Sequence, residues 1–358
     1  MLIVNMIPVL NNLEENKEAC QSGCNAIPDG FVEVPTEIDK QIDRKFDFMR
    51  QKTTQMGYRF VGRHSAIKVC HWTKESVRGK NACYKNKFYG IESNQCVQMS
   101  PSMLMCSFNC RFCWRNFDYV LPREKEDWDD PKQVLDGCID AQIEILQGFY
   151  GNPNVDMDKL DKAMIPQHVA ISLSGEPTLY PYLPEFIDEI IGRKMTAYLV
   201  SNGTRPQMIE RLIQHQPTNL YVSFYGTTPE MYKKTAVPME KDFWENVNKS
   251  LMMLGKFDCN TVVRLTLSKG LNFTDPEGYA RIIEKSGTKF IEVKGFMAVG
   301  GSRKSMKYSD MPLHNEIQDF AAKIESNSSY RIVNEKKDSR VVLLARDSGG
   351  RLEAPDDV

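Results

Sequence analysis

The amino-acid sequence predicts an α/β barrel of the TIM type, with parallel strands, a modified last section and an N-terminal extension. From about residue 95 onward, short apolar runs alternate with stretches of helical periodicity, which is typical of repeated βα units in a parallel sheet. Polar residues follow several successive strands, at the edge where such barrels hold their sites. The 358 residues are 41% hydrophobic and 26% charged, which excludes wholesale disorder.

Four parts are predicted along the chain. Residues 1–57 form the extension, with a helix near 39–57. Residues 58–105 are a basic, cysteine-bearing segment that begins with the extended stretches Tyr58–Val61 and Ala66–Val69. Residues 95–347 form the barrel, and residues 348–358 are a tail.

Eight strands and six helices are expected in the barrel. The strands are Gln95–Met99, His168–Leu173, Thr196–Val200, Leu220–Phe224, Val262–Leu267, Phe290–Phe296, Arg331–Val333 and Val341–Leu344. The helices lie near residues 131–149, 182–193, 205–214, 240–255, 276–286 and 312–325. Asp130-Pro131 and Asp275-Pro276 each supply a helix cap followed by a proline in the first turn. A glycine-rich nucleotide loop of the GxGxxG or Walker A type does not occur in the sequence.

The ten cysteines point to metal chemistry. No apolar run approaches the roughly 20 residues that span a bilayer. The apolar start lacks a basic region and a cleavage site, so we expect a cytoplasmic protein without a membrane segment. Because cytosolic thiols are kept reduced, metal binding explains the cysteines better than disulfides do.

Two sets of three cysteines are spaced regularly. Cys106, Cys110 and Cys113 form a C-x3-C-x2-C motif, and Cys70, Cys83 and Cys96 form a C-x12-C-x12-C motif. A closed structural site would need four protein ligands, whereas three thiolates leave one iron of a 4Fe–4S cluster open. We therefore predict two open clusters. Cys20 and Cys24 remain unassigned, and Cys138 and Cys259 are interpreted as core residues.

Polar motifs follow the predicted strands. Ser174-Gly175-Glu176-Pro177 follows the second strand, Asn202 follows the third, Ser223 ends the fourth, and Arg264 lies within the fifth. Taken singly, the Gly-Glu-Pro and Asn-Gly sequences would indicate turns. Their placement behind the C-x3-C-x2-C loop favours a shared site instead.

The Cys106–Cys113 loop, with Phe112 before its last cysteine, resembles the signature of radical S-adenosylmethionine (SAM) enzymes. In that superfamily the open iron binds SAM, and the reduced cluster cleaves it to a 5′-deoxyadenosyl radical. The resemblance implies that Ser174, Gly175 and Glu176 hold the SAM amino group. It also places Asn202 and Ser223 at the ribose, Arg264 at the carboxylate and Phe112 near the adenine.

Further segments resemble a narrower family, the archaeal tRNA 4-demethylwyosine synthases. They are Gly62–Ser65, Val69–Trp72, Cys83–Gly90, Phe112–Arg115, Ile171–Tyr182 and Val262–Gly270. The resemblance covers roughly residues 55–347. It implies a radical SAM carbon–carbon lyase of wybutosine biosynthesis, which condenses pyruvate with N1-methylguanosine 3′ of the anticodon of tRNA-Phe.

The same resemblance implies a role for each cluster. The Cys106/Cys110/Cys113 cluster would bind SAM, and the auxiliary Cys70/Cys83/Cys96 cluster would bind pyruvate. Lys85 would form an imine with pyruvate, because an amine is the right nucleophile for a carbonyl; Lys87 is the second candidate. We expect an external flavodoxin or ferredoxin as reductant, and a monomer.

The net charge of −1 hides a strong polarity along the chain. Residues 44–88 hold 12 Lys and Arg against 2 acids, whereas residues 118–161 hold 12 acids against 4 Lys and Arg. The basic block contains the aromatic residues Trp72, Tyr84, Phe88 and Tyr89, on which a flipped base could stack. A second basic patch comprises Arg303, Lys304 and Lys307. These features favour tRNA docking over a simply solvated face.

Two alternatives remain open from the sequence. One is a radical SAM enzyme for a small molecule or a protein, in which the second cysteine set holds an electron-transfer cluster. The other is a non-catalytic zinc or iron–sulfur RNA-binding module, which leaves the barrel motifs unexplained.

Overall fold

The computed structural model describes residues 37–115, 119–122 and 126–346. By its contacts the chain divides into two units, Met1–Lys45 and Phe46–Val358, and the barrel belongs to the second. The predicted N-terminal helix is observed as α1 (Glu37–Gln55). Cys20 and Cys24 lie outside the described residues. Among the described residues, every helix is too short or too polar to cross a membrane.

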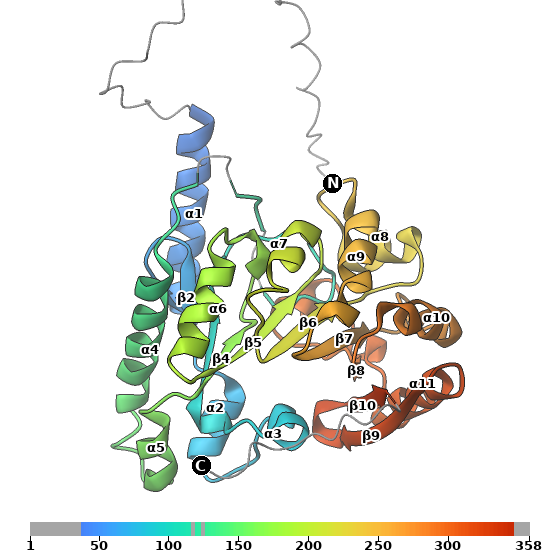
Figure 1. Cartoon of the computed structure of the whole chain (residues 1–358). Helices are drawn as coiled ribbons and strands as arrows, with labels where there is room; N and C mark the ends of the chain where they lie inside the picture. Colours follow the sequence, from blue (N-terminus) through green and yellow to red (C-terminus); the bar gives the residue numbers. More distant parts are fainter. Residues whose placement is uncertain (1–36, 116–118, 123–125, 347–358) are drawn as a thin grey trace, which may run out of the picture. The chain divides into compact units, whose positions relative to one another are not determined.

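One ten-stranded sheet forms the framework, in the order β1-β2-β3-β4-β5-β6-β7-β8-β10-β9 (Figure 1). The strands are β1 (Arg59–Val61), β2 (Ser65–Ile67), β3 (Cys96–Ser100), β4 (His168–Ile171), β5 (Thr196–Ser201), β6 (Asn219–Ser223), β7 (Asn260–Leu267), β8 (Phe290–Gly295), β9 (Tyr330–Lys336) and β10 (Val341–Arg346). Neighbouring strands from β3 to β8 are parallel, which confirms the predicted α/β barrel class.

The last section departs from the parallel pattern. β10 pairs antiparallel with both β8 and β9, so β10 runs against the barrel strands while β9 keeps their direction. The connection explains this reversal: only residues 337–340 join β9 to β10, and a parallel crossover needs a dozen or more residues. This hairpin is the modified end of the barrel.

The helices follow the strands as predicted, with small shifts at their ends. The predicted helices are observed as α4 (Pro131–Gln147), α6 (Leu183–Gly192), α7 (Pro206–Arg211), α9 (Phe243–Met252), α10 (Pro276–Ser286) and α11 (His314–Ser326). Asp130 and Asp275 cap α4 and α10, each accepting hydrogen bonds from backbone N–H groups of the first turn. Both caps therefore confirm the sequence prediction.

Four helices were not predicted. They are α2 (His71–Val77), α3 (Tyr84–Tyr89), α5 (Met157–Ala163) and α8 (Pro229–Ala236). Each has eight residues or fewer, which is too short to show helical periodicity clearly. Two of them, α2 and α3, begin directly after cysteines of the C-x12-C-x12-C motif.

The core has an outer and an inner part. Most apolar strand residues, such as Val169 and Leu199, pack against the surrounding helices. A second cluster contains Tyr198, Tyr221, Val262 and Phe290 from the parallel strands, together with residues of α3. Helix α3 therefore packs on the inner face of the barrel sheet and brings its polar side chains to the same region.

Candidate active site

Both cysteine triads line one cavity of about 730 Å³. The cavity is also lined by most of the other predicted site residues, namely Lys85, Phe112, Gly175, Glu176, Asn202, Ser223 and Arg264. Ser174 is buried beside the cavity without lining it. Folding thus gathers residues from Cys70 to Arg264 at one place.

The first triad lies on the loop after β3. The backbone N–H of Cys106 donates to the Val120 carbonyl (3.0 Å), and the N–H of Cys113 donates to the Cys110 carbonyl (3.0 Å). Burial raises the pKa of Cys110, and the neighbouring charges of Cys113 and Cys106 raise it further. The three sulfur atoms therefore influence one another, as ligands of one cluster must.

Gly175 packs directly against the cysteine loop. Its φ is +71°, and an added Cβ would lie 1.9 Å from the Ser102 carbonyl oxygen and 2.5 Å from that of Met105. Only glycine fits both the left-handed backbone and this close approach. The N–H of Glu176 donates to the Met105 carbonyl (2.8 Å), so the Ser174–Pro177 motif is joined to the segment that carries the first triad.

The Glu176 carboxylate is almost fully buried and accepts hydrogen bonds from this chain. The donors are the Asn202 N–H (2.6 Å), the Ser201 hydroxyl (2.7 Å), and the Thr178 hydroxyl and N–H (2.6 and 3.1 Å). Burial raises the pKa of Glu176 more than these donors lower it. The carboxylate therefore holds Ser201 and Asn202, at the end of β5, in place and also faces the cavity.

The remaining predicted SAM contacts surround the same loop. Asn202 donates to the Ser107 hydroxyl (2.9 Å) and lies 3.8 Å from the Cys106 sulfur. The Phe112 ring lies 5.1 Å from the ring of Tyr225, centroid to centroid. Ser223 ends β6 and is buried. Their roles toward SAM stay predictions.

The second triad is supplied by two helix starts and a strand start. Cys70 and Cys83 are the residues just before α2 and α3, and Cys96 begins β3. Backbone N–H groups of Trp72 and Thr73 lower the pKa of Cys70, although burial raises it more. Burial and then Cys70 raise the pKa of Cys96 to about 12. The three cysteines of the C-x12-C-x12-C motif thus come together at one cavity.

Both triads fit an iron–sulfur cluster by their chemistry. All six cysteines are free thiols on one cavity, and in each triad the neighbouring cysteine charges raise thiol pKa values. Bound iron would stabilise the thiolate forms that burial disfavours. Among the described residues no group of three side chains surrounds a single metal ion. A multi-iron cluster holds each thiolate on a different iron, so it does not need such a tight group.

Lys85 is buried on α3 and lines the cavity. Its ammonium nitrogen lies 4.7 Å from the ring centroid of Tyr221 and 5.0 Å from that of Tyr198. Burial lowers the pKa of Lys85, and the positive charge of Arg264 lowers it further. Both effects increase the fraction of neutral amine, which is the nucleophilic form.

Lys87 is placed differently. Its Nζ donates to the Glu335 carbonyl (2.8 Å), and the residue does not line the cavity. The two lysines of α3 therefore point to different surroundings, and of the two Lys85 is the one that lines the cavity.

Arg264 is already engaged by other residues of this chain. Its Nε lies 2.9 Å from a carboxylate oxygen of Glu292, and it donates to the Tyr84 hydroxyl (2.7 Å). Burial opposes its charged form, but the charge of Glu292 raises its pKa. The predicted contact of Arg264 with the SAM carboxylate stays a prediction, and its observed partners lie beside the second triad.

Sequence reasoning missed Glu292 and Lys294. Glu292 is fully buried and accepts hydrogen bonds from Tyr84 (3.2 Å) and Tyr89 (2.9 Å) of α3. Lys294 lines the cavity two residues later on β8. The sequence did contain a sign of them: the predicted strand Phe290–Phe296 is otherwise largely apolar, yet it has charged residues at two alternate positions.

The expected aromatic stacking surface is mostly wrong. Phe88 is 1% and Tyr89 9% exposed, and both belong to the inner core cluster together with Tyr84. They cannot receive a base without unpacking α3. Trp72 lines the cavity, and so it remains the one candidate of the four that is neither buried nor in that cluster.

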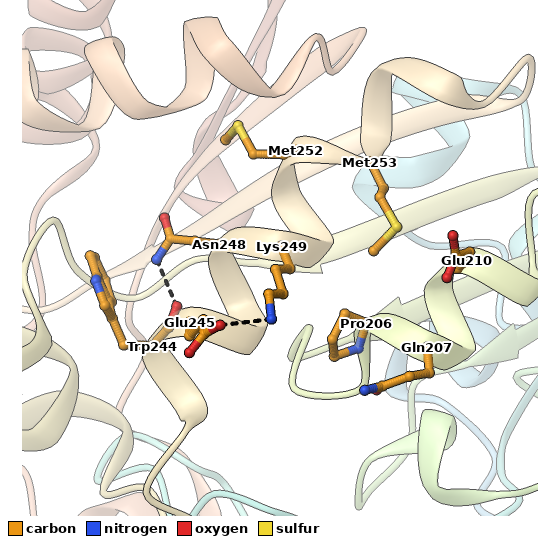
Figure 2. Close-up of a pocket in the computed structure, with 9 residues that line it drawn as sticks. All are labelled: Pro206, Gln207, Glu210, Trp244, Glu245, Asn248, Lys249, Met252 and Met253. Atoms are coloured by element: carbon orange, nitrogen blue, oxygen red, sulfur yellow. Dashed lines mark hydrogen bonds and ion pairs between the residues drawn. The ribbon is translucent and has the colours of Figure 1, made fainter.

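A second cavity, of about 670 Å³, lies between α7 and α9 (Figure 2). Pro206, Gln207 and Glu210 of α7 face residues of α9, including Trp244 and the ion pair Glu245–Lys249 (2.7 Å). None of the predicted site residues lines it. The candidate active site is therefore the cavity with the two triads.

Comparison with known proteins gives consistent results. A family model for wyosine base formation matches residues 285–346. The chain is 44% identical to the S-adenosyl-L-methionine-dependent tRNA 4-demethylwyosine synthase of Pyrococcus abyssi, over 81% of this chain and 86% of that protein. It is 37% identical to the enzyme of the same name from Methanocaldococcus jannaschii, over 80% of this chain and 92% of that protein.

Two solved structures are also similar. A structure of TYW1 with a lysine-pyruvate adduct bound has a TM-score of 0.75 and 34% identity, covering 88% of this chain and 97% of that one. The crystal structure of archaeal TYW1 has a TM-score of 0.68 and 31% identity, covering 88% of this chain and 98% of that one. With this identity and coverage, the chain belongs to the tRNA 4-demethylwyosine synthase family.

Proposed function

We propose that this protein is a SAM-dependent lyase that condenses pyruvate with N1-methylguanosine in tRNA-Phe to form 4-demethylwyosine. The observation that carries the proposal is the single cavity lined by both cysteine triads and Lys85. A reaction that joins two substrates needs both reacting groups in one space, and this cavity provides it. Family membership supplies the identity of the substrates.

Each triad holds a 4Fe–4S cluster in this proposal. Cys106, Cys110 and Cys113 hold the one that binds SAM, and Cys70, Cys83 and Cys96 hold the auxiliary one. When bound, the first cluster would supply the electron for reductive cleavage of SAM, and the resulting 5′-deoxyadenosyl radical would remove hydrogen from the methyl group of the base. Gly175 and Glu176 orient the SAM amino group from the loop after β4, and Asn202 and Ser223 contact the ribose.

Lys85 activates pyruvate in this proposal. Its neutral amine adds to the carbonyl carbon of pyruvate, and water leaves as the imine forms. Two carbons of pyruvate then join the base as the bond to the carboxyl carbon breaks. The exocyclic amine of the base takes over the imine carbon, which closes the ring and releases the Lys85 amine. The rings of Tyr198 and Tyr221 flank the amine, and burial together with the charge of Arg264 favours its neutral form. The lysine-pyruvate adduct in the similar structure supports a lysine in this role.

The proposed partners are an electron donor and the tRNA. An external flavodoxin or ferredoxin delivers the electron, and the protein acts as a cytoplasmic monomer. tRNA docks through basic residues near the cavity mouth, where Trp72 and the loop after β8 contribute lining residues.

The decisive experiment counts iron. After anaerobic reconstitution we expect about eight irons per chain in the wild type and about four in the Cys70/Cys83/Cys96→Ala triple variant. A Cys259→Ala variant, altered at a cysteine outside the cavity, serves as the control and should keep all the iron. The wild type should convert tRNA-Phe carrying N1-methylguanosine to 4-demethylwyosine, measured by nucleoside mass spectrometry. Unchanged iron in the triple variant would refute the two-cluster assignment.

A further inference from the structure

Lys294 is a buried cation of the cavity that the proposed chemistry does not yet use. It lies on β8 opposite Thr266 of β7. This pair is two residues further along the strands than the Arg264–Glu292 pair, and so it lies on the same face of the sheet. Because Lys294 is the next-to-last residue of a parallel strand, its side chain lies at the carboxyl end of the barrel, where TIM-type barrels bind their substrates. The side chain lines the same cavity as Lys85.

The contacts of Lys294 leave donor capacity toward the cavity. An ammonium group has three N–H donors. Within the described residues, Nζ donates to the Ser339 carbonyl (2.7 Å) and lies 5.2 Å from the Tyr84 ring centroid, and it has no ion-pair partner. The cavity-lining carboxylate of Asp338 is paired with Lys336 at 3.3 Å instead. The charges of Glu292 and Asp338 raise the pKa of Lys294 without forming an ion pair with it. A buried ammonium that forms no ion pair favours a bound anion.

Arg264 and Lys85, which line the cavity with Lys294, have different tasks. Arg264 is held by Glu292 and Tyr84, so its charge is already compensated. Lys85 has to be neutral to attack a carbonyl. Once its nitrogen is part of the imine, it no longer offers the three N–H donors of an ammonium group to the carboxylate.

Burial lowers the pKa of Lys294 to about 8, which leaves it mostly charged at neutral pH. Lys68 also lines the cavity, but its Nζ donates to the Met56 carbonyl (2.9 Å) and lies 4.5 Å from the Tyr58 ring centroid. Lys294 is thus the cation beside Arg264 and Glu292 that is left for a small anion.

We propose that Lys294 binds the carboxylate of the 2-oxo acid whose carbonyl carbon reacts with Lys85. This inference rests on the proposed function and adds the group that selects an acid over a neutral ketone. With the carboxylate held from β8 and the carbonyl carbon attacked from α3, the substrate is fixed at both ends. The Ser339 carbonyl orients the ammonium group and leaves its other donors to the substrate.

The test uses the reconstituted full-length protein, pyruvate and cyanoborohydride, which reduces an imine to a stable secondary amine. The mass of the peptide that contains Lys85 measures the adduct. In Lys294→Met we expect the half-saturating pyruvate concentration to rise about 10- to 100-fold, as for loss of a charged hydrogen bond. Lys294→Arg should recover part of this loss. Lys289→Met is the matched control, since Lys289 also donates to a carbonyl, that of Asp258, but does not line the cavity.

A second measurement separates recognition from structural support. Methyl pyruvate carries the same reactive carbonyl without the charge. The wild type should prefer pyruvate over methyl pyruvate, and Lys294→Met should lose that preference while Lys289→Met keeps it. A destabilised cavity would weaken both ligands equally, so an unchanged preference in Lys294→Met overturns the inference while leaving Lys85 as the nucleophile.

The position of the adduct in the wild type separates a failure of the proposed function from a failure of the role given to Lys294. If the wild type forms no adduct at any lysine, the imine chemistry of the proposed function is wrong. If the adduct forms on Lys294 itself, Lys294 is the nucleophile and the inference is overturned.

Discussion

At the scale of single residues, Glu292 joins two parts of the site. Its buried carboxylate accepts from Tyr84 and Tyr89 of α3 and pairs with Arg264 of β7. Helix α3 carries Lys85, and Cys83 directly precedes it. Glu292 is therefore a positioning residue, because it ties the helix with the nucleophile to the barrel wall.

Removing this charge should be costly. We expect Glu292→Gln to lower the free energy of unfolding by about 3 kcal/mol, because Arg264 would remain buried without its counter-charge. Glu245→Gln removes a carboxylate from the exposed Glu245–Lys249 pair and should leave the free energy of unfolding nearly unchanged. Denaturant unfolding measures both, and equal effects would contradict the role given to Glu292.

Gly175 offers a test of the close contact under the cysteine loop. Gly175→Ala should destabilise the protein by more than Gly270→Ala, although both glycines have a similar positive φ (+71° and +75°). The reason is that nothing lies within 4 Å of a Cβ at Gly270, whereas backbone oxygens meet one at Gly175. The Gly270 variant measures the cost of the backbone conformation alone, about 1 kcal/mol.

The iron content of the same two variants gives a second measurement. We expect Gly175→Ala to lose iron from the Cys106/Cys110/Cys113 site, because the Cβ would displace the backbone that precedes Cys106. Gly270→Ala should keep its iron. Full iron content in Gly175→Ala would show that the loop tolerates the shift.

At the scale of elements, His168 couples β4 to its neighbours and makes stability depend on pH. Its Nε2 accepts from the Glu92 N–H (3.1 Å), and its Nδ1 lies 2.7 Å from the Thr196 hydroxyl. Burial lowers the pKa of His168 to about 4. The folded state thus keeps a neutral ring at pH values where the unfolded chain, with an ordinary pKa near 6.5, binds a proton.

As pH falls from about 6.5 to about 4, the unfolded state gains a proton that the folded state does not, so folding stability decreases. We expect a loss of at most about 3 kcal/mol from this group across that range. His168→Gln, which does not titrate, should show a shallower decline in denaturant unfolding between pH 7 and pH 4.5. Parallel curves for the two proteins would contradict the assignment.

At the scale of the whole molecule, folding changes the meaning of the charge pattern. Arg63 pairs with Asp127 (2.6 Å) and Arg59 with Glu144 (3.3 Å), so members of the basic block meet members of the acidic one. These pairs are exposed, and their main effect is to reduce the positive field of the block. The second basic patch, Arg303, Lys304 and Lys307, follows the cavity-lining Met297 and Val299 in the sequence. It is not followed by a long acidic stretch like residues 118–161.

This arrangement predicts which basic residues bind tRNA. Arg303→Gln with Lys304→Gln should weaken tRNA binding and reduce the slope of log affinity against log salt by up to about 2, one unit for each phosphate that is no longer neutralised. Arg59→Gln with Arg63→Gln should have a smaller effect, because both side chains already face carboxylates. Filter binding over a salt series distinguishes them, and an equal effect of both pairs would show that the two patches contribute alike.

The sequence by itself determined the parallel strands, the helix caps and the two cysteine triads. Those features depend on local patterns: apolar periodicity, Asp-Pro capping pairs and fixed spacings. It also selected Lys85, since a resemblance in the Cys83–Gly90 segment carries that information.

Only the tertiary structure decided how these parts combine. The Glu292–Arg264–Tyr84 network, the burial of Phe88 and Tyr89, the antiparallel β9–β10 hairpin and the approach of Lys294 to the cavity join residues far apart in the chain. No local pattern encodes such contacts, because each depends on which strand faces bring distant side chains together. The triads were visible as spacings, but their convergence on one cavity, from which the function follows, required the folded barrel.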